Sequence, residues 1–133
     1  MVQRAARAKP LERRSARILV VDDEPAVIRV LQRILIEHEV IVARNAMDAL
    51  RHVSAGPKFD LVLCDLMMPE MTGMQLHAAM LEQVPDQAER MVFLTGGAFE
   101  PEAATFLDST VNRTVGKPFD AAELLALVDQ SIR

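Results

Sequence analysis

The chain alternates between short, unbroken apolar runs and longer stretches in which apolar residues recur with helical spacing. The apolar runs predict five β-strands, at Ile18–Val21, Val40–Ala43, Leu61–Cys64, Met91–Leu94 and, less clearly, Asn112–Val115. Because these runs are continuous and do not alternate with polar residues, we expect both faces of the sheet to be covered.

The longer stretches carry apolar residues at every third or fourth position, which predicts five helices. The apolar stripes fall within residues 27–35, 46–53, 76–80, 103–107 and 121–132. Helix start signals agree with this division. Thr72 with Gln75 fits a capping box, Asp120 with Glu123 is a close variant, and Asn45 is suited to cap the second helix.

Five repeats of strand followed by helix predict an α/β fold, a doubly wound parallel sheet with helices on both faces. The 133 residues are enough for one such domain, which we place at residues 17–133. Residues 1–16 are polar and charged, contain Pro10 and show no periodicity. We therefore interpret them as a basic linker or flexible lead.

Charge is distributed unevenly along the chain. Residues 1–17 hold six of the fifteen Lys and Arg residues and one of the nineteen acidic residues, a net charge of +5, so residues 18–133 carry −9. An acidic body argues against nucleic acid as the partner of the domain. The absence of Tyr and Trp also weakens the case for base stacking.

The single cysteine, Cys64, rules out an internal disulfide and favours a reducing compartment, where we expect it to pack as a small hydrophobe. No apolar run approaches the length of a membrane span. We therefore expect a cytoplasmic protein without a membrane partner. His38, His52 and His77 share no spacing that would suggest a metal site.

Polar residues that could bind a ligand or take part in a reaction follow four of the predicted strands. They are Asp22–Glu24, Asp65, Thr95–Gly97 and Lys117–Pro118. Ligands of open parallel sheets bind at the carboxyl ends of the strands, so these residues should converge on one edge. Several carboxylates in one cleft need a cation, and oxygen ligands without a His or Cys pattern point to Mg²⁺.

A lysine and a threonine beside such a cluster can hold a phosphoryl group through charge and a hydroxyl donor. Together with the cation, they describe a site that forms an acyl phosphate on one carboxylate. Asp65 is the best-placed acceptor because it ends the central strand, whereas Asp22 and Asp23 on the neighbouring strand suit metal ligands.

Four segments resemble the receiver family of two-component response regulators. They are Ile-Leu-Val-Val-Asp-Asp-Glu-Pro (18–25), Leu-Val-Leu-Cys-Asp-Leu-Met-Met-Pro-Glu-Met-Thr-Gly (61–73), Phe-Leu-Thr-Gly-Gly (93–97) and Gly-Lys-Pro-Phe (116–119). In order and spacing the resemblance covers residues 17–132. It implies a flavodoxin-like sheet with strand order 2-1-3-4-5.

The resemblance also implies a ligand set for Mg²⁺. Asp65 would be the phosphoacceptor and a metal ligand, Asp23 a direct ligand, and Asp22 a ligand acting mainly through water. The backbone carbonyl of Met67 would complete the protein ligands.

The phosphoryl group would be met by two further residues. The resemblance implies that Thr95 reaches it after phosphorylation, that Lys117 pairs with it, and that the Lys117–Pro118 bond is cis. The expected partner is a sensor histidine kinase or a histidine phosphotransfer protein, with room for a dimer that forms on phosphorylation. An isolated receiver is not an enzyme, although it phosphorylates itself from a phosphodonor and slowly loses the group.

One position departs from the family pattern. Receivers usually carry Tyr or Phe three residues before the lysine, and this chain has Thr114 there, with Phe99 as a candidate substitute. The departure leaves open a second interpretation, a degenerate receiver that binds partners without phosphorylation.

The run at 95–99 and the Phe-Leu-Asp at 106–108 also resemble receivers of hybrid histidine kinases. A third reading, an aspartyl phosphohydrolase, is rejected because Met67 stands where such an enzyme needs a second acid.

Overall fold

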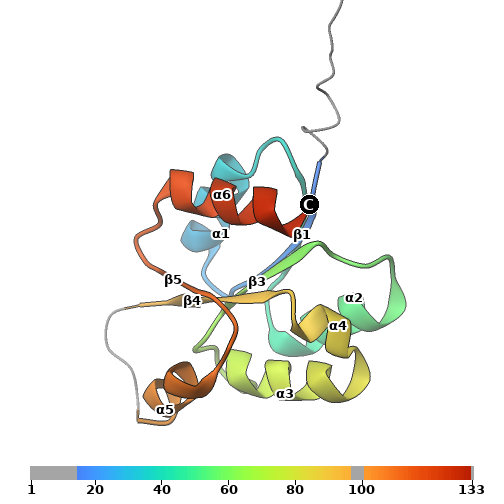
Figure 1. Cartoon of the computed structure of the whole chain (residues 1–133), viewed down its shortest axis with the longest axis vertical. Coiled ribbons are helices and arrows are strands. Elements are labelled where there is room, and N and C mark those ends of the chain that lie inside the picture. The colour runs from blue at the N-terminus through green and yellow to red at the C-terminus, as the bar shows by residue number, and fades with distance from the viewer. Residues whose placement is uncertain (1–14, 97–100, 133) are drawn as a thin grey trace, which may run out of the picture.

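The computed structural model describes residues 15–96 and 101–132, which form five strands and six helices (Figure 1). The strands are β1 (Arg17–Val21), β2 (Glu39–Ala43), β3 (Leu61–Asp65), β4 (Met91–Thr95) and β5 (Thr114–Gly116). The helices are α1 (Pro25–Ile34), α2 (Ala46–Ala55), α3 (Gly73–Gln83), α4 (Pro85–Ala88), α5 (Pro101–Ser109) and α6 (Ala121–Ser131).

The five strands form one parallel sheet in the order β2-β1-β3-β4-β5, which confirms the predicted topology. β3 lies at the centre, with β1 and β4 as its neighbours. Every residue of β3 is buried, as expected for a strand whose two faces are both covered by helices.

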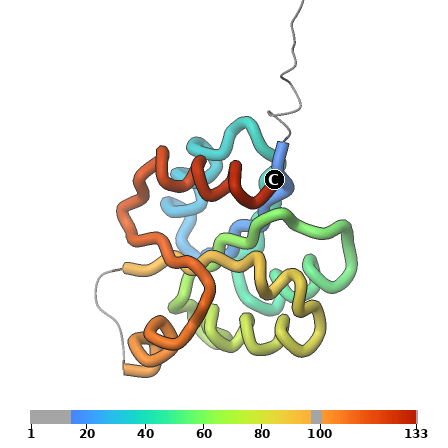
Figure 2. The backbone as a smooth tube through the Cα atoms, in the orientation of Figure 1, coloured from blue at the N-terminus to red at the C-terminus, as the bar shows by residue number. Residues whose placement is uncertain are grey.

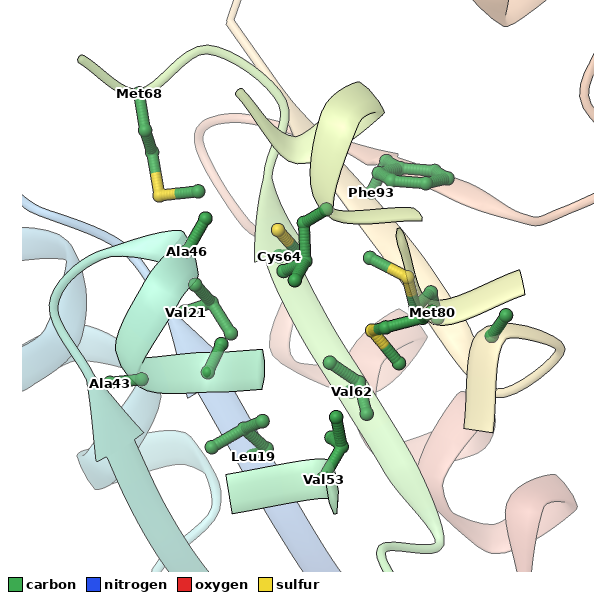
Figure 3. Packing of buried hydrophobic residues seen from close by; sticks show 14 of the residues in the cluster. Leu19, Val21, Ala43, Ala46, Val53, Val62, Cys64, Met68, Met80 and Phe93 are labelled. Carbon is green, nitrogen blue, oxygen red and sulfur yellow. The ribbon is translucent and has the colours of Figure 1, made fainter. Parts of the chain in front are cut away.

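Alternate residues of the strands enter two separate apolar layers. In β1, Leu19 and Val21 face the layer formed with α2, α3, α4 and α5, whereas Ile18 and Val20 face the layer formed with α1 and α6. Figure 3 shows the first layer, where Val21 of β1 lies close to Ala46 of α2. This two-sided burial is the physical reason for the continuous apolar runs in the sequence.

The predicted helix starts are confirmed by their hydrogen bonds. Thr72 and Gln75 exchange both bonds of a capping box at the start of α3. The Asn45 side chain accepts from the backbone N–H of Asp48, and Asp120 caps α6. In the part of the chain that the structure describes, no helix is both long enough and apolar enough to cross a membrane.

The prediction of five helices missed α4, a single turn that begins at Pro85. Its Gln87 is buried, and the Gln87 side chain accepts from the Phe59 N–H at 2.9 Å and donates to the Phe59 carbonyl at 3.1 Å. α4 therefore anchors the segment that leads into β3. One turn is too short to produce a helical stripe, so its pattern merged with the end of α3.

The last strand was predicted too early in the chain. Asn112 lies before β5, and its side-chain N–H₂ donates to the carbonyls of Ala88 and Met91. At the other end, β1 begins at Arg17, and the Ala16 N–H donates to Nδ1 of the half-buried His38. The predicted linker at 1–16 falls mostly outside the described residues and stays a prediction.

Candidate functional site

The carboxyl edge of the sheet brings together residues that are distant in the sequence. Val21 of β1 pairs with Cys64 of β3, so the next residues, Asp22 and Asp65, leave the sheet side by side. Lys117 follows β5 directly. Alternation along the strands directs these three side chains toward the α1 and α6 side of the sheet.

Lys117 bridges the two buried carboxylates. Its Nζ lies 3.4 Å from Oδ1 of Asp65 and 3.5 Å from Oδ2 of Asp22. The Lys117–Pro118 peptide bond is cis, as the family resemblance implied. The sequence prediction that strand ends would meet at one edge is thus confirmed for these three residues.

Three carboxylates form a cluster with the geometry of a cation site. Asp22, Asp23 and Asp65 each offer an oxygen, and these oxygens all lie within 4.8 Å of one another. Asp22 and Asp65 are buried, and Asp23 is exposed at the mouth. Among the described residues this is the one cluster of acidic, His or Cys groups suited to a metal, and it contains no His.

The three acids of the cluster outnumber the positive charges and hydrogen-bond donors beside them. Oδ1 of Asp22 accepts from the Glu24 N–H at 2.9 Å, but its buried Oδ2 has no hydrogen-bond partner. Asp22 and Asp65 also share a single ammonium group, that of Lys117. Oxygen donors with one unsatisfied, buried atom fit a hard divalent cation such as Mg²⁺.

The electrostatics of Asp65 reflect the same shortage of positive charge. Burial, and then the nearby Asp22, raise the pKa of Asp65 to about 6. Lys117 and a hydrogen bond from the Met67 backbone oppose this rise. Burial likewise raises the pKa of Asp22. Ionising both acids at neutral pH is therefore unfavourable without further positive charge nearby.

Met67 lies beside the acceptor, as its backbone hydrogen bond to Asp65 shows. Its side chain is partly exposed at the rim of the site. The predicted role of the Met67 carbonyl as a metal ligand stays a prediction.

Thr95 lies at the same edge, but its side chain is separate from the acidic cluster. Its carbonyl accepts from the Lys117 N–H at 2.8 Å, and the residue before it, Leu94, pairs with Asp65. Alternation places the Thr95 side chain with Phe93, on the opposite face from the Asp65 carboxylate. The predicted contact of Thr95 with a phosphoryl group stays a prediction, and Phe99 lies outside the described residues.

The loop after Asp65 contains two positions whose roles the sequence did not reveal. Glu70 has φ of 71°, a left-handed conformation that is uncommon for residues other than glycine. At Gly73, a Cβ would lie 2.5 Å from the Asp65 carbonyl oxygen and 3.1 Å from the Leu66 Cα. Glycine at 73 is therefore what lets the start of α3 approach the end of β3.

Two further side chains near the site were singled out in the sequence. Cys64 is buried, burial raises the pKa of its thiol, and its Sγ donates to the Asp65 carbonyl, so it packs as a small hydrophobe. Thr114 is exposed at the start of β5, where receivers usually carry an aromatic residue.

Comparison with known proteins gives a family match over most of the chain. Residues 18–129 match the model of the response regulator receiver domain. The uncharacterized transcriptional regulatory protein YkoG of Bacillus subtilis is 33% identical over 119 residues, covering 87% of this chain and 50% of YkoG. An uncharacterized 14.6 kDa protein in the sodA1 3′ region of Leptolyngbya boryana is 38% identical over 117 residues, covering 85% of this chain and 87% of that protein.

Solved structures show the same fold. The receiver domain of a signal transduction histidine kinase from Syntrophus aciditrophicus has a TM-score of 0.76 and 28% identity, covering 89% of this chain and 90% of that one. The receiver domain of sensor histidine kinase PA1611 from Pseudomonas aeruginosa, with magnesium in its active site cleft, has a TM-score of 0.77 and 23% identity, covering 90% and 98%. The chain spans about half the length of transcriptional regulators such as YkoG.

Proposed function

This chain belongs to the response regulator receiver family, and from that premise we propose that Asp65 accepts a phosphoryl group from a phosphohistidine of a partner protein. The observation that carries the proposal is the convergence of Asp65 with Asp22, Asp23 and Lys117 at one edge of the sheet. The partner would be a sensor histidine kinase or a histidine phosphotransfer protein. A small phosphodonor such as acetyl phosphate should replace it in solution.

Mg²⁺ would be held by Asp22, Asp23 and Asp65 together with the carbonyl of Met67, and when bound it would neutralise charge on the phosphoryl oxygens. The support for this ligand set is the 4.8 Å cluster and the buried Oδ2 of Asp22, which accepts no hydrogen bond and has only the longer ion pair with Lys117. Aspartates that are costly to ionise in the apo site would both be ionised beside a divalent cation.

An Asp65 carboxylate oxygen forms the new bond to phosphorus, and the bond between phosphorus and the imidazole nitrogen of the donor breaks. Nζ of Lys117 is 3.4 Å from the Asp65 carboxylate, so the ammonium group can pair with the negatively charged phosphoryl oxygens as a point charge. The Thr95 hydroxyl makes no hydrogen bond within the described residues, so it is available to donate to the phosphoryl group once that group is in place.

The product adds a charge of about −1.5 to −2 at the site. Movement of Thr95 toward it should shift β4 and the adjoining α5 and β5, and so bias a two-state equilibrium of that face. Met67, two residues beyond the acceptor, offers no acid or base to activate water. Slow loss of the phosphoryl group is therefore expected, which suits a signalling switch and not a phosphatase that turns over many substrates.

The setting of the domain is also a proposal. We expect it to work in the cytoplasm, either as part of a longer regulator or as the receiver of a hybrid kinase, and to be compatible with a dimer that forms on phosphorylation.

One observation favours a second function. The exposed Thr114 lacks the aromatic ring of the usual switch, so a receiver that only binds partners is the alternative.

Intact-mass measurement after incubation with Mg²⁺ and acetyl phosphate tests the proposal. We expect the protein to gain one phosphoryl group, and to gain none after Asp65→Asn or in the presence of a chelator. Asp108→Asn, at an exposed position on α5, is the matched control and should gain the group normally.

A second arm uses a phosphorylated histidine phosphotransfer protein as donor, because some sites reject small phosphodonors. Failure of the wild-type protein to gain a phosphoryl group from either donor would contradict the proposal. The alternative, a receiver that acts by binding alone, would then be favoured.

A further inference from the structure

A groove lies between α3 and α5, on the face of the sheet opposite the acidic cluster. Figures 1 and 2 show that α3 and α5 lie on the same side of the sheet. We call this groove the α3–α5 groove. Its volume is about 660 Å³, and its apolar walls are formed by Met74, Ala78, Leu81, Phe106 and Val111. None of the residues that line it belongs to the proposed phosphorylation site, so the groove is not part of that site.

Two large apolar side chains at this groove are exposed to solvent. Leu81, in the last half of α3, is 50% exposed, and Val111, in the loop after α5, is 98% exposed. Neighbouring exposed apolar residues beside a concave surface are typical of an interaction site. Scattered single residues would carry no such meaning, but these two flank the same hollow.

The floor of the groove has no polar group waiting for a ligand. His77 packs edge-to-face against Phe93 and Phe106, at ring distances of 5.6 Å and 5.8 Å, and hydrogen-bonds to the Asn112 side chain. Asn112 in turn donates to two backbone carbonyls, those of Ala88 and Met91. Burial lowers the pKa of His77, so the floor is uncharged at neutral pH. Such a floor suits apolar side chains and not a polar small molecule.

The charged residues of the two helices that flank the groove, other than histidine, are all acidic. Neither α3 nor α5 contains Lys or Arg, while α3 carries Glu82 and α5 carries Glu102 and Asp108. Glu89 lies in the lining of the groove itself. The nearest cations in sequence lie toward α6.

Arg90 donates to the carbonyls of Asp60 and Ser131, at the amino-terminal edge of the sheet. Arg113 lines hollows formed with α6, one of which adjoins the α3–α5 groove at Glu89, Val111 and Asn112, so the basic residues lie at the α6 end of the groove and its α3 side is acidic. A partner surface that complements the α3–α5 groove would therefore be apolar at its centre and basic at its rim.

We propose that the α3–α5 groove docks a basic amphipathic helix of a partner protein. Apolar side chains of that helix would lie between Leu81 and Phe106, and its Lys or Arg residues would pair with Glu82 and Glu89. From Met74 to Leu81 the groove wall extends about 10 Å along α3, which is two turns. That length matches two or three anchors spaced at i, i+3 or i+4, and i+7. The docking does not require phosphorylation at Asp65.

The probe is a helical peptide about four turns long, with Leu residues and one Trp on one face and Lys on the other. The protein contains no Trp or Tyr, so emission from the peptide Trp reports binding without background. We expect the emission to move to shorter wavelength with saturable binding. The same peptide with Glu in place of Lys should not bind.

Paired variants locate the binding surface. Leu81→Gln should weaken peptide binding by at least about tenfold, because it removes an apolar anchor without adding charge. Ile36→Gln makes the same kind of change at an apolar residue that is 78% exposed and remote from the groove, and should leave binding within about twofold. Asp65→Asn should bind the peptide like wild type, so failure here and failure of the phosphorylation proposal remain distinguishable.

Three results would overturn the proposal. The first is no binding of the Lys peptide, and the second is equal weakening by Leu81→Gln and Ile36→Gln, which would indicate attraction to the acidic surface in general. The third is a dimer in sedimentation velocity, without peptide, that Leu81→Gln abolishes. In that case a second copy of this chain, and not a partner helix, covers the groove.

Discussion

Asp65 acquires its character from neighbours that are distant in sequence. Burial and Asp22 make its ionised form unfavourable, while Lys117 and the Met67 backbone make it more favourable. The balance leaves a carboxyl group whose pKa is about 6, close to the pH at which the domain is expected to work. The residue is therefore sensitive to any cation that enters the site.

Asp65→Asn is expected to raise the free energy of unfolding in Mg²⁺-free buffer at about pH 7.5 by roughly 1–3 kcal/mol. The folded pKa of about 6 lies above the ordinary 3.8, so the ionised carboxylate destabilises the folded state. That cost is absent below the unfolded pKa, grows between the two values and is complete above the folded one. Because Asp65→Asn also removes the ion pair with Lys117, the increase in the free energy of unfolding is smaller than the pKa shift alone would give.

Urea denaturation at several pH values measures this effect. The advantage of Asp65→Asn should shrink to about half near pH 5. Asp108→Asn, at an exposed acid, should show little change at any pH. If the difference in free energy of unfolding between Asp65→Asn and the wild type did not change with pH, burial would not penalise the Asp65 charge.

Gly73→Ala is expected to lower the free energy of unfolding by about 1–3 kcal/mol, because the new methyl group would meet the backbone at Asp65 and Leu66. It should also slow phosphorylation by acetyl phosphate, since the end of β3 must shift. Gly116→Ala is the control, because a Cβ there meets nothing within 4 Å. Equal stability of the two variants in urea would contradict the close approach seen at Gly73.

At the scale of elements, the strands and the long helices could be predicted from periodicity, whereas the single-turn helix α4 and the bounds of β5 could not. The apolar stripes of α1, α2 and α6 are long enough to be recognised, and the capping residues of α3 mark its start. α4 has four residues and β5 has three, so neither is long enough for its period to repeat clearly. Their positions depend on contacts with Phe59 and, through Asn112, with β4.

Gln87→Ala tests whether α4 anchors the entry to β3. We expect a loss of about 2–4 kcal/mol in the free energy of unfolding, because two buried hydrogen bonds to the Phe59 backbone disappear and leave their partners unpaired. Gln83→Ala, at an exposed position on α3, should change stability by less than about 0.5 kcal/mol. Chemical denaturation monitored by circular dichroism measures both. Similar values for the two variants would show that α4 is dispensable.

At the scale of the whole molecule, the proposed metal site joins β1, β3 and the loop after β3. A cation that binds only the folded arrangement stabilises all of these elements together. The acidic body, with −9 over residues 18–133, adds to the attraction of cations. Folding and Mg²⁺ binding should therefore be coupled.

Mg²⁺ is expected to raise the thermal midpoint of unfolding, and the gain in the free energy of unfolding should grow with the logarithm of the Mg²⁺ concentration above Kd, reaching about 2.7 kcal/mol at a hundredfold excess over Kd. Asp23→Asn should remove most of this effect with little structural cost, since Asp23 is exposed. Glu70→Gln, another exposed acid near the site, should retain it. Scanning calorimetry at constant ionic strength measures the shift. A similar rise with Na⁺ alone would indicate general screening of charge.

The sequence by itself determined the fold class, the strand order through the family resemblance, and the set of acidic, Lys and Thr residues at the strand ends. It could do so because strand and helix periods are local properties, and because the carboxyl ends of parallel strands must meet at one edge. Only the tertiary structure decided that Lys117 spans Asp22 and Asp65, that Gly73 allows the close approach of α3, and that α3 and α5 leave an apolar groove with an acidic rim. These features depend on distance and desolvation between segments far apart in the chain, which no local pattern encodes.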